Sequence, residues 1–383
     1  MSAYGDDDPL PSSNTGLGPH GRPGSRTVTA SMPPESLRRI LIRLPNWVGD
    51  MMMALPAIQS LLAARPEARL FGMARPEHLE LAQRIPALEE IITAAPRAGA
   101  DRQRAVWTAA RTLRNAHFDA AILLAPSFEA ALTVWLAGIP IRVGHDTDHR
   151  TVLLNRVVDV RDGHRMDGFD DLVSELGAKP ANGGGGLACT AADRAYADRL
   201  FERAGFGLDD RPIFVNPAAA KKPRAWSSDR FLQLADVVAE RHAKSRVLVH
   251  DHAPFAPPAG WPSSASICLV SGASLVELAG LLGRCSLYVG NDSGPMHIAA
   301  ALGVPTIGIY GSSSPERTSP RGLKGAQHIS ISASFACSPC RERFFDECPS
   351  PPTPDERPPC LNEISVEMVA DAVDRVLSSQ GSG

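Results

Sequence analysis

Short apolar runs alternate with segments of helical periodicity in two series, and this alternation restricts the fold more than any other feature of the chain. In the first series we expect strands at 39–44, 69–74, 120–125 and 139–144, and helices at 50–64, 103–116 and 128–137. Strands that alternate with helices of about ten or more residues are typical of a parallel sheet covered by helices.

One asparagine followed by four glycines at 182–186 interrupts the pattern, as a flexible connector does. The second series contains expected strands at 212–216, 246–250, 266–270, 287–290 and 306–310, and helices at 193–204, 228–241, 274–283 and 295–302. The sequence therefore predicts an α/β protein with two Rossmann-like domains and a cleft between them, with ligands bound outside the carboxyl ends of the strands.

The remaining segments set the limits of these domains. Residues 1–36 are polar, rich in proline and glycine and without periodicity, which predicts a disordered tail. The predicted order is tail 1–36, N-terminal domain 37–180, linker and connecting helix 181–210, C-terminal domain 211–363 with a cysteine-rich insertion at 335–361, and C-terminal helix and tail 364–383.

Composition excludes several classes of protein. A net charge of -3 is unlike the strongly basic nucleic-acid-binding domains, so no nucleic-acid partner is expected. Seven cysteines in 383 residues are too few for a disulfide scaffold, and no apolar signal segment opens the chain, which predicts a cytoplasmic protein. Residues 121–140 approach the length of a membrane span, but Pro126, Ser127 and Glu129 interrupt them, which favours a buried strand, turn and helix.

The first motif that could carry chemistry is Leu44-Pro-Asn-Trp-Val-Gly-Asp-Met-Met-Met53. It places Asp50 where a strand turns into a helix, at the edge of the sheet where ligands bind. A carboxylate there is either a helix N-cap or a catalytic group, and local sequence favours the cap. The three methionines are expected in the core.

The second motif is Gly290-Asn-Asp-Ser-Gly-Pro-Met-His297, which again joins a strand to a helix. Free amide groups at Ser293 and Gly294 would attract a phosphate, and His297 could donate a further hydrogen bond. The alternative is a plain connection capped by Asp292 or Ser293.

The third motif contains three cations, Lys221, Lys222 and Arg224, in the loop after the first strand of the second series. These side chains could neutralise a diphosphate leaving group, with lysine as a point charge and arginine as a fork. The alternative is a solvated basic loop.

Four cysteines near the C-terminus form a fourth candidate site: Cys337, Cys340, Cys348 and Cys360. A C-x-x-C pair with two further thiols could close a structural zinc site, although the separation of Cys348 and Cys360 is unusual for one. Four reduced thiols are the alternative. A catalytic metal is not expected.

Together these segments resemble the bacterial heptosyltransferases of glycosyltransferase family 9, in particular the lipopolysaccharide heptosyltransferase II branch. The resemblance rests on Trp47-Val-Gly-Asp-Met-Met-Met53, Trp135-Leu-Ala-Gly-Ile-Pro-Ile-Arg-Val-Gly144 and Gly290-Asn-Asp-Ser-Gly-Pro-Met-His297, and on the cysteine segments. It covers about residues 38–377.

The resemblance implies a GT-B architecture in which the C-terminal helix at 365–377 returns to the first domain. It also implies inverting transfer of heptose from ADP-L-glycero-D-manno-heptose to the lipopolysaccharide inner core, without a required cofactor. The partners implied are this donor and a lipid A–core acceptor at the membrane surface. A monomer is expected, cytoplasmic and peripherally attached to the inner face of the inner membrane.

The resemblance also implies roles for individual residues. Asp50 matches the general base, Lys221 or Lys222 the lysine that contacts the donor diphosphate, and residues 292–294 with His297 the donor-binding loop. Acceptor-side candidates in the first domain are Asn46, Trp47, Arg142 and Arg150, although the segment from Arg142 to Arg150 could equally be a surface loop.

One loop departs from the family pattern. Residues 250–260, His-Asp-His-Ala-Pro-Phe-Ala-Pro-Pro-Ala-Gly, replace a glycine-rich turn, and three prolines cannot follow the same backbone path. Surface positions are expected for His250 and His252. The change bears on the nucleotide contacts and leaves two alternatives: a catalytically silent nucleotide-sugar-binding protein, or another sugar-nucleotide enzyme of the same fold, such as an epimerase.

Overall fold

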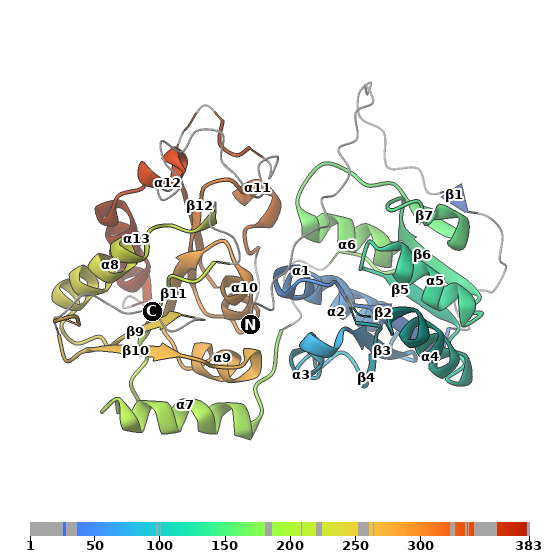
Figure 1. The fold of residues 1–383 in the computed structure, drawn as a ribbon, viewed down its shortest axis with the longest axis horizontal. Helices are drawn as coiled ribbons and strands as arrows, with labels where there is room; N and C mark the ends of the chain where they lie inside the picture. Colours follow the sequence, from blue (N-terminus) through green and yellow to red (C-terminus); the bar gives the residue numbers. More distant parts are fainter. Residues whose placement is uncertain are drawn as a thin grey trace. The chain divides into compact units, whose positions relative to one another are not determined.

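The computed structural model describes residues 26–27, 37–96, 99, 101–180, 186–207, 209–219, 224–251, 260–262, 264–321, 326–333, 335, 337–340 and 358–380. The chain divides into two compact units, Met1–Gly185 and Gly186–Gly383, each built around its own sheet (Figure 1).

The sheet of the first unit runs in the order β1-β7-β6-β5-β2-β3-β4. Its strands are β1 Arg26–Thr27, β2 Arg39–Arg43, β3 Arg69–Ala74, β4 Glu90–Thr93, β5 Ala120–Leu123, β6 Ile141–His145 and β7 Arg156–Val158. All neighbours are parallel except β1, which pairs antiparallel with β7. The central strands β2 and β5 are buried on both faces, as parallel strands between helical layers are.

Helices cover this sheet. They are α1 Val48–Met53, α2 Leu55–Ala64, α3 Leu79–Ala82, α4 Arg102–Asn115, α5 Phe128–Leu136 and α6 Arg165–Ser174, with short 3-10 turns η2 Pro76–His78 and η3 Thr151–Leu153. Leu41 and Leu123 of the sheet pack with Leu113 of α4 and Val134 of α5 in one apolar cluster.

The sheet of the second unit is fully parallel, in the order β10-β9-β8-β11-β12-β13. Its strands are β8 Ile213–Asn216, β9 Val247–Asp251, β10 Ile267–Ser271, β11 Leu287–Asn291, β12 Thr306–Tyr310 and β13 His328–Ser332. Its helices are α7 Ala191–Arg203, α8 Ser228–Arg241, α9 Leu275–Leu282, α10 Gly294–Ala301, α11 Pro315–Thr318, α12 Pro359–Asn362 and α13 Val366–Gln380.

Both parallel sheets have the Rossmann strand order, which confirms the predicted α/β class. When the strands are numbered within each unit and β1 is left aside, both orders read 3-2-1-4-5-6. In such sheets the strand order reverses at one switch point, and ligands bind beyond the carboxyl ends of the two strands that meet there. The switch points are β2/β5 in the first unit and β8/β11 in the second.

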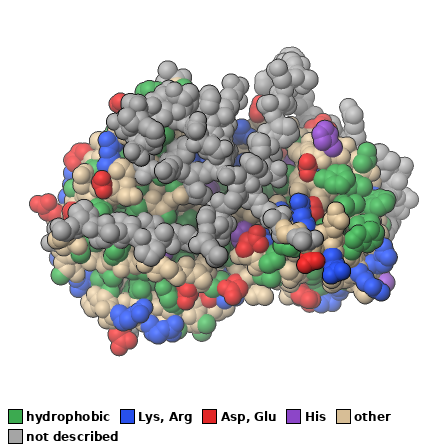
Figure 2. All heavy atoms as spheres, viewed as in Figure 1, with side chains coloured by type: hydrophobic (Ala, Val, Ile, Leu, Met, Phe, Trp, Pro, Cys, Tyr) green, Lys and Arg blue, Asp and Glu red, His purple; other side chains and the backbone are tan. Residues whose placement is uncertain are grey.

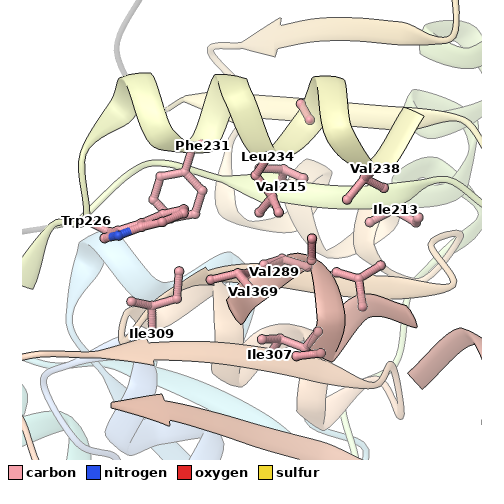
Figure 3. Packing of buried hydrophobic residues seen from close by; sticks show 14 of the residues in the cluster. Ile213, Val215, Trp226, Phe231, Leu234, Val238, Val289, Ile307, Ile309 and Val369 are labelled. Atoms are coloured by element: carbon pink, nitrogen blue, oxygen red, sulfur yellow. The ribbon is translucent and has the colours of Figure 1, made fainter. Parts of the chain in front are cut away.

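The core of the second unit joins its sheet to α8 and α13. The Trp226 ring lies edge-on to Phe231 at 4.8 Å between centroids, and its indole Nε1 donates to the carbonyl of Ile364 at 2.9 Å. Figure 3 shows side chains of α8, β8, β11, β12 and α13 converging on this cluster, Val369 of α13 among them.

The position of the C-terminal helix differs from the expectation. The resemblance implies a return to the first domain, whereas the buried face of α13 packs against α8 and belongs to the core of the second unit. Ion pairs reinforce this contact: Arg241 of α8 binds Glu367, Asp371 (3.1 Å) and Asp374 (2.8 Å) of α13. The apolar stripe of α13 is thus used within its own unit.

The helix predicted within 181–210 is α7, and it packs against α9 of the second unit, where only a glycine at position 280 fits against the carbonyl of Asp193. Other segments differ from the prediction. The sequence predicts disorder throughout 1–36, whereas Arg26 and Thr27 pair with β7. The short strands β4, β7 and β13 and the polar helix α6 have no clear periodicity and are not predicted.

Residues 121–140 form the buried strand β5 and helix α5, as predicted. In the described part of the chain, no helix combines the length and apolar character that crossing a bilayer requires.

The packing of α13 on α8 can be tested by truncating one buried side chain. We expect Val373→Ala to reduce the unfolding free energy of the second unit by about 1–3 kcal/mol, because it leaves a cavity between these helices. Hydrogen exchange should then accelerate in α8 and α13. The control is Met368→Ala, since Met368 on the same helix is 42% exposed and its loss should change little. Faster exchange in the first unit instead would contradict the assignment.

Candidate functional site

The corner between β2 and α1 presents Asp50 at the switch point of the first unit. Trp47, not Asp50, is the N-cap residue of α1, and Asp50 is the third residue of the helix. The N-cap interpretation of Asp50 is therefore wrong. Its carboxylate is partly accessible and pairs with Arg165 at the start of α6, with 3.5 Å between Oδ1 and Nε. The neighbouring Met51, Met52 and Met53 are buried, as expected of core residues.

A buried guanidinium holds this corner in place. Arg43, the last residue of β2, donates to the carbonyl of Leu44 at 2.6 Å and to Oδ1 of Asn46 at 2.8 Å. Burial lowers the pKa of Arg43 to about 10, so it stays protonated at neutral pH. His78 lies 3.0 Å from the carbonyl of Asn46, and burial lowers its pKa as well. Asn46 is thus engaged within the corner, whereas Trp47 beside it is 43% exposed.

The other two acceptor-side candidates, Arg142 and Arg150, donate hydrogen bonds to loop carbonyls. Arg150 is fully buried, donates from Nε to the carbonyl of His145 at 3.0 Å and binds the carbonyl of Ala125 through Nη1. Burial lowers its pKa to about 10. Arg142 donates to the carbonyls of Leu153 (2.7 Å) and Ile139 (2.6 Å). Complete burial corrects the expectation that Arg150 meets an anionic acceptor, whereas that role of the half-buried Arg142 stays a prediction.

At the switch point of the second unit, the side chain of Asn291 fastens the loop that follows β8. Its Oδ1 accepts from the amide of Trp226 at 2.8 Å, and its Nδ2 donates to the carbonyl of Pro217 at 2.9 Å. One buried amide therefore holds both ends of the loop that carries the predicted cations. Lys221 and Lys222 lie outside the described residues; Arg224 lies within them.

Asp292 stands at the centre of a buried polar cluster directly after β11. Its Oδ1 lies 3.8 Å from Nε2 of His297, and both side chains are at most 6% exposed. Burial by itself raises the pKa of Asp292, but His297, Arg224 and Ser313 outweigh it and hold the pKa below its ordinary value. The carboxylate is therefore ionised, and its charge is compensated within the cluster. The structure thus brings together three of the predicted donor-site residues: Asp292, His297 and Arg224.

The start of α10 completes the predicted anion site. Ser293 is the N-cap residue with an extended backbone and makes no capping bond through its side chain, and Gly294 begins the helix. Amide groups at the start of a helix have no partners within it and favour an anion. Gly290 lies in β11, four residues before Gly294, where a Cβ would come 2.5 Å from the Tyr288 hydroxyl.

One loop of this site is not predicted from the sequence. Residues 312–314 are three consecutive serines after β12, and all three are buried. They neighbour the Asp292 loop, since the amide of Asp292 donates to Ile309 at 3.1 Å and Ser313 contributes to the lowered pKa of Asp292. The available signal was Tyr310-Gly-Ser-Ser-Ser314, a small-residue turn at the carboxyl end of a predicted strand.

The cysteines do not support the predicted zinc site. Cys360 is buried in the apolar core next to α13, while Cys337 is exposed and Sγ of Cys340 lies 3.5 Å from the carbonyl of Ser312. Cys348 lies outside the described residues. Within the described ranges, no three His, Cys, Asp or Glu side chains are grouped as metal ligands.

The unusual segment 250–260 begins inside β9 with a buried residue, His250. The sequence predicts a surface position for His250, whereas it is 2% exposed and its ring lies 5.5 Å from that of Phe214. His252 and most of the proline-rich loop lie outside the described residues.

Comparison with known proteins gives consistent matches. The model of glycosyltransferase family 9 (heptosyltransferase) matches residues 106–348. Lipopolysaccharide heptosyltransferase 2 of Escherichia coli strain K12 is 29% identical over 315 residues, which cover 75% of this chain and 86% of that protein. The solved structure of E. coli ADP-heptose LPS heptosyltransferase II superposes with a TM-score of 0.70 at 23% identity, covering 90% of this chain and 99% of that one. E. coli heptosyltransferase WaaC with ADP superposes with a TM-score of 0.65 at 18% identity, covering 88% and 99%.

The Asp292 cluster predicts a specific dependence of stability on pH. Because the pKa of Asp292 is lowered in the folded state, its stabilising effect is complete above the ordinary pKa of an aspartate and is lost as the pH falls through the lowered pKa. We expect Asp292→Asn to destabilise the second unit by about 1–3 kcal/mol at pH 7, and the deficit to shrink in acid. Hydrogen exchange of β11 and β12 at several pH values measures it.

The matched control is Asp209→Asn, an exposed carboxylate in the same unit, which should have little effect at any pH. A deficit for Asp292→Asn that stays constant from about pH 3 to pH 7 would contradict an ionised, compensated carboxylate.

Proposed function

This chain belongs to glycosyltransferase family 9 (heptosyltransferase), and we propose that it transfers heptose from ADP-L-glycero-D-manno-heptose to the lipopolysaccharide inner core. The family match and the similarity to lipopolysaccharide heptosyltransferase 2 support the reaction class and substrates. The observation that carries the proposal is that each unit has its predicted functional corner at its switch point.

The second unit supplies the donor site in this proposal. The amides at the start of α10 receive a phosphate of ADP, and Lys221 or Lys222 with Arg224 balances the charge that develops as ADP leaves. A bare carboxylate beside a diphosphate would repel it. Asp292 therefore acts through its neighbours: it holds the ring of His297 in place and is itself neutralised by His297 and Arg224.

The first unit supplies the base. Asp50 takes the proton of the acceptor hydroxyl, whose oxygen forms the new bond to the anomeric carbon. The bond from that carbon to the phosphate oxygen breaks, and ADP leaves with the electron pair. Attack opposite to the leaving group inverts the configuration at this carbon. Arg165 positions the carboxylate through its ion pair with Asp50.

The acceptor in this proposal is a lipid A–core oligosaccharide at a membrane surface, which implies a cytoplasmic enzyme that binds the inner membrane peripherally. A monomer suffices, since each proposed role is assigned within one chain. Trp47 remains the acceptor-side candidate of the β2–α1 corner, because its indole is exposed three residues before Asp50.

The role of Asp50 is tested by Asp50→Asn, which keeps the shape of the side chain and removes its basicity. We expect transfer to fall by about two to four orders of magnitude, because general-base catalysis contributes that much. ADP affinity should be unchanged, since the proposed donor site lies in the other unit. Heptose transfer is measured with ADP-heptose and a core acceptor. Turnover close to that of the wild type would remove Asp50 from this role.

The two lysines are tested separately by Lys221→Ala and Lys222→Ala. One substitution should weaken ADP binding about tenfold and the other should not, because only one is expected to contact the diphosphate. Isothermal titration calorimetry with ADP measures the affinities. Equal and negligible effects would support the solvated-loop alternative.

A further inference from the structure

The first unit exposes large apolar side chains on two adjacent helices. Trp107 of α4 is 62% exposed, Phe128 and Trp135 of α5 are 39% and 48% exposed, and Val152 of η3 is 81% exposed. We call these four residues the aromatic face. Figure 2 shows hydrophobic side chains gathered where α5 lies in Figure 1, with Lys or Arg side chains beside them toward α4.

Contacts between the elements place these residues on one side of the unit. α4 packs along α5, and α5 also contacts η3. The two helices run in the same direction, because Arg102 near the start of α4 binds Glu129 of α5 at 3.1 Å and Arg114 near the end of α4 binds the carbonyl of Leu136. Phe128 and Trp135 are seven residues apart, two helical turns, and thus share a side of α5.

The apolar side chains of this face are not needed by the core. α4 already packs its own apolar stripe inward through Val106, Ala109, Ala110 and Leu113. Trp107 points away from that stripe. An exposed tryptophan beside further exposed apolar side chains marks an interaction surface rather than ordinary surface variation.

The side of the face formed by α4 is positively charged, whereas the carboxylate of Asp148 binds the amide of Phe128 at the start of α5. α4 contains Arg102, Arg104, Arg111 and Arg114 and no acidic residue. Arg104 and Arg111 lie three residues before and four residues after Trp107, on the same side of the helix. Arg104 pairs with Asp101 at 3.9 Å, and this ion pair is weak because both side chains are 85% exposed to solvent. Within the described residues Arg111 forms no ion pair.

We propose that the aromatic face binds the surface of an anionic phospholipid membrane. Tryptophan prefers the boundary between headgroups and acyl chains, and arginine beside it is attracted by the negative lipid headgroups. The inference rests on the proposed function in one respect: a lipid-linked acceptor requires the enzyme to work at such a surface. The face would hold the first unit, which carries the proposed base, next to that acceptor.

The test is co-flotation of the full chain with vesicles of phosphatidylglycerol and phosphatidylethanolamine. We expect binding to these vesicles and little to neutral phosphatidylcholine. Trp107→Ser with Trp135→Ser should weaken binding about tenfold or more, and Arg104→Gln with Arg111→Gln about tenfold, the latter effect disappearing at high salt. The matched control is Leu269→Ser with Met368→Ser, exposed apolar residues of the second unit, which should leave binding unchanged.

Equal binding by the face variants and the wild type would overturn the proposal, as would equal binding to neutral and anionic vesicles. So would a dimer in solution that the tryptophan substitutions dissociate, since the face would then bind a second copy. Circular dichroism confirms that the variants are folded.

Activity separates this inference from the proposed function. With a water-soluble, deacylated core acceptor, the face variants should transfer heptose at the wild-type rate, and with acceptor embedded in anionic vesicles at a rate about tenfold lower. If the wild type bound vesicles but transferred no heptose, the proposed function would be contradicted, whereas membrane binding by the aromatic face would still be supported. Transfer that is equally fast in both formats for every variant would overturn the face alone.

Discussion

Hydrogen bonds from buried polar side chains to loop carbonyls hold the loops at the switch points of both units in place. A loop that leaves a sheet buried on both faces must find hydrogen-bond partners inside the protein, because water does not reach its first residues. Arg43 and Arg150 serve the loops after β2 and β5, and Asn291 serves the loop after β8. Asp50 is thus held at the switch point of the first unit, and Pro217 and Trp226, on either side of the basic loop, are held at that of the second.

Each unit also contains buried charged side chains, and their charges are compensated differently in the two units. In the first unit Arg43 and Arg150 stay protonated despite burial, and the buried Glu129 lies 4.0 Å from Arg75 and 3.1 Å from Arg102. In the second unit the carboxylate of Asp292 is buried, and His297, Arg224 and Ser313 hold its pKa below the ordinary value although burial raises it. A donor site that must accept a diphosphate next to a carboxylate is workable only with that compensation.

The sequence predicts the strands and helices of both sheets well where apolar periodicity is strong, and it identifies the corners at Asp50 and Asp292. The sequence does not predict those contacts that depend on residues far apart in the chain. Arg142 and Arg150 lie in a polar segment typical of a surface loop, yet their guanidinium groups are bound to backbone carbonyls that no sequence pattern reveals. The sequence also does not reveal which unit α13 packs against. Its apolar stripe indicates that one side of the helix is buried, but not which unit buries it. The serines after β12 gain their role only from the neighbouring strand β11.

The central claim is heptose transfer by this chain, and product analysis tests it most directly. Purified protein is incubated with ADP-heptose and a heptose-deficient lipid A–core acceptor, and the acceptor and nucleotide are followed by mass spectrometry. We expect one added heptose per acceptor and an equal amount of released ADP. An unchanged acceptor with intact donor, or conversion of the donor to an isomer, would contradict it and favour a silent nucleotide-sugar-binding protein or an epimerase, respectively.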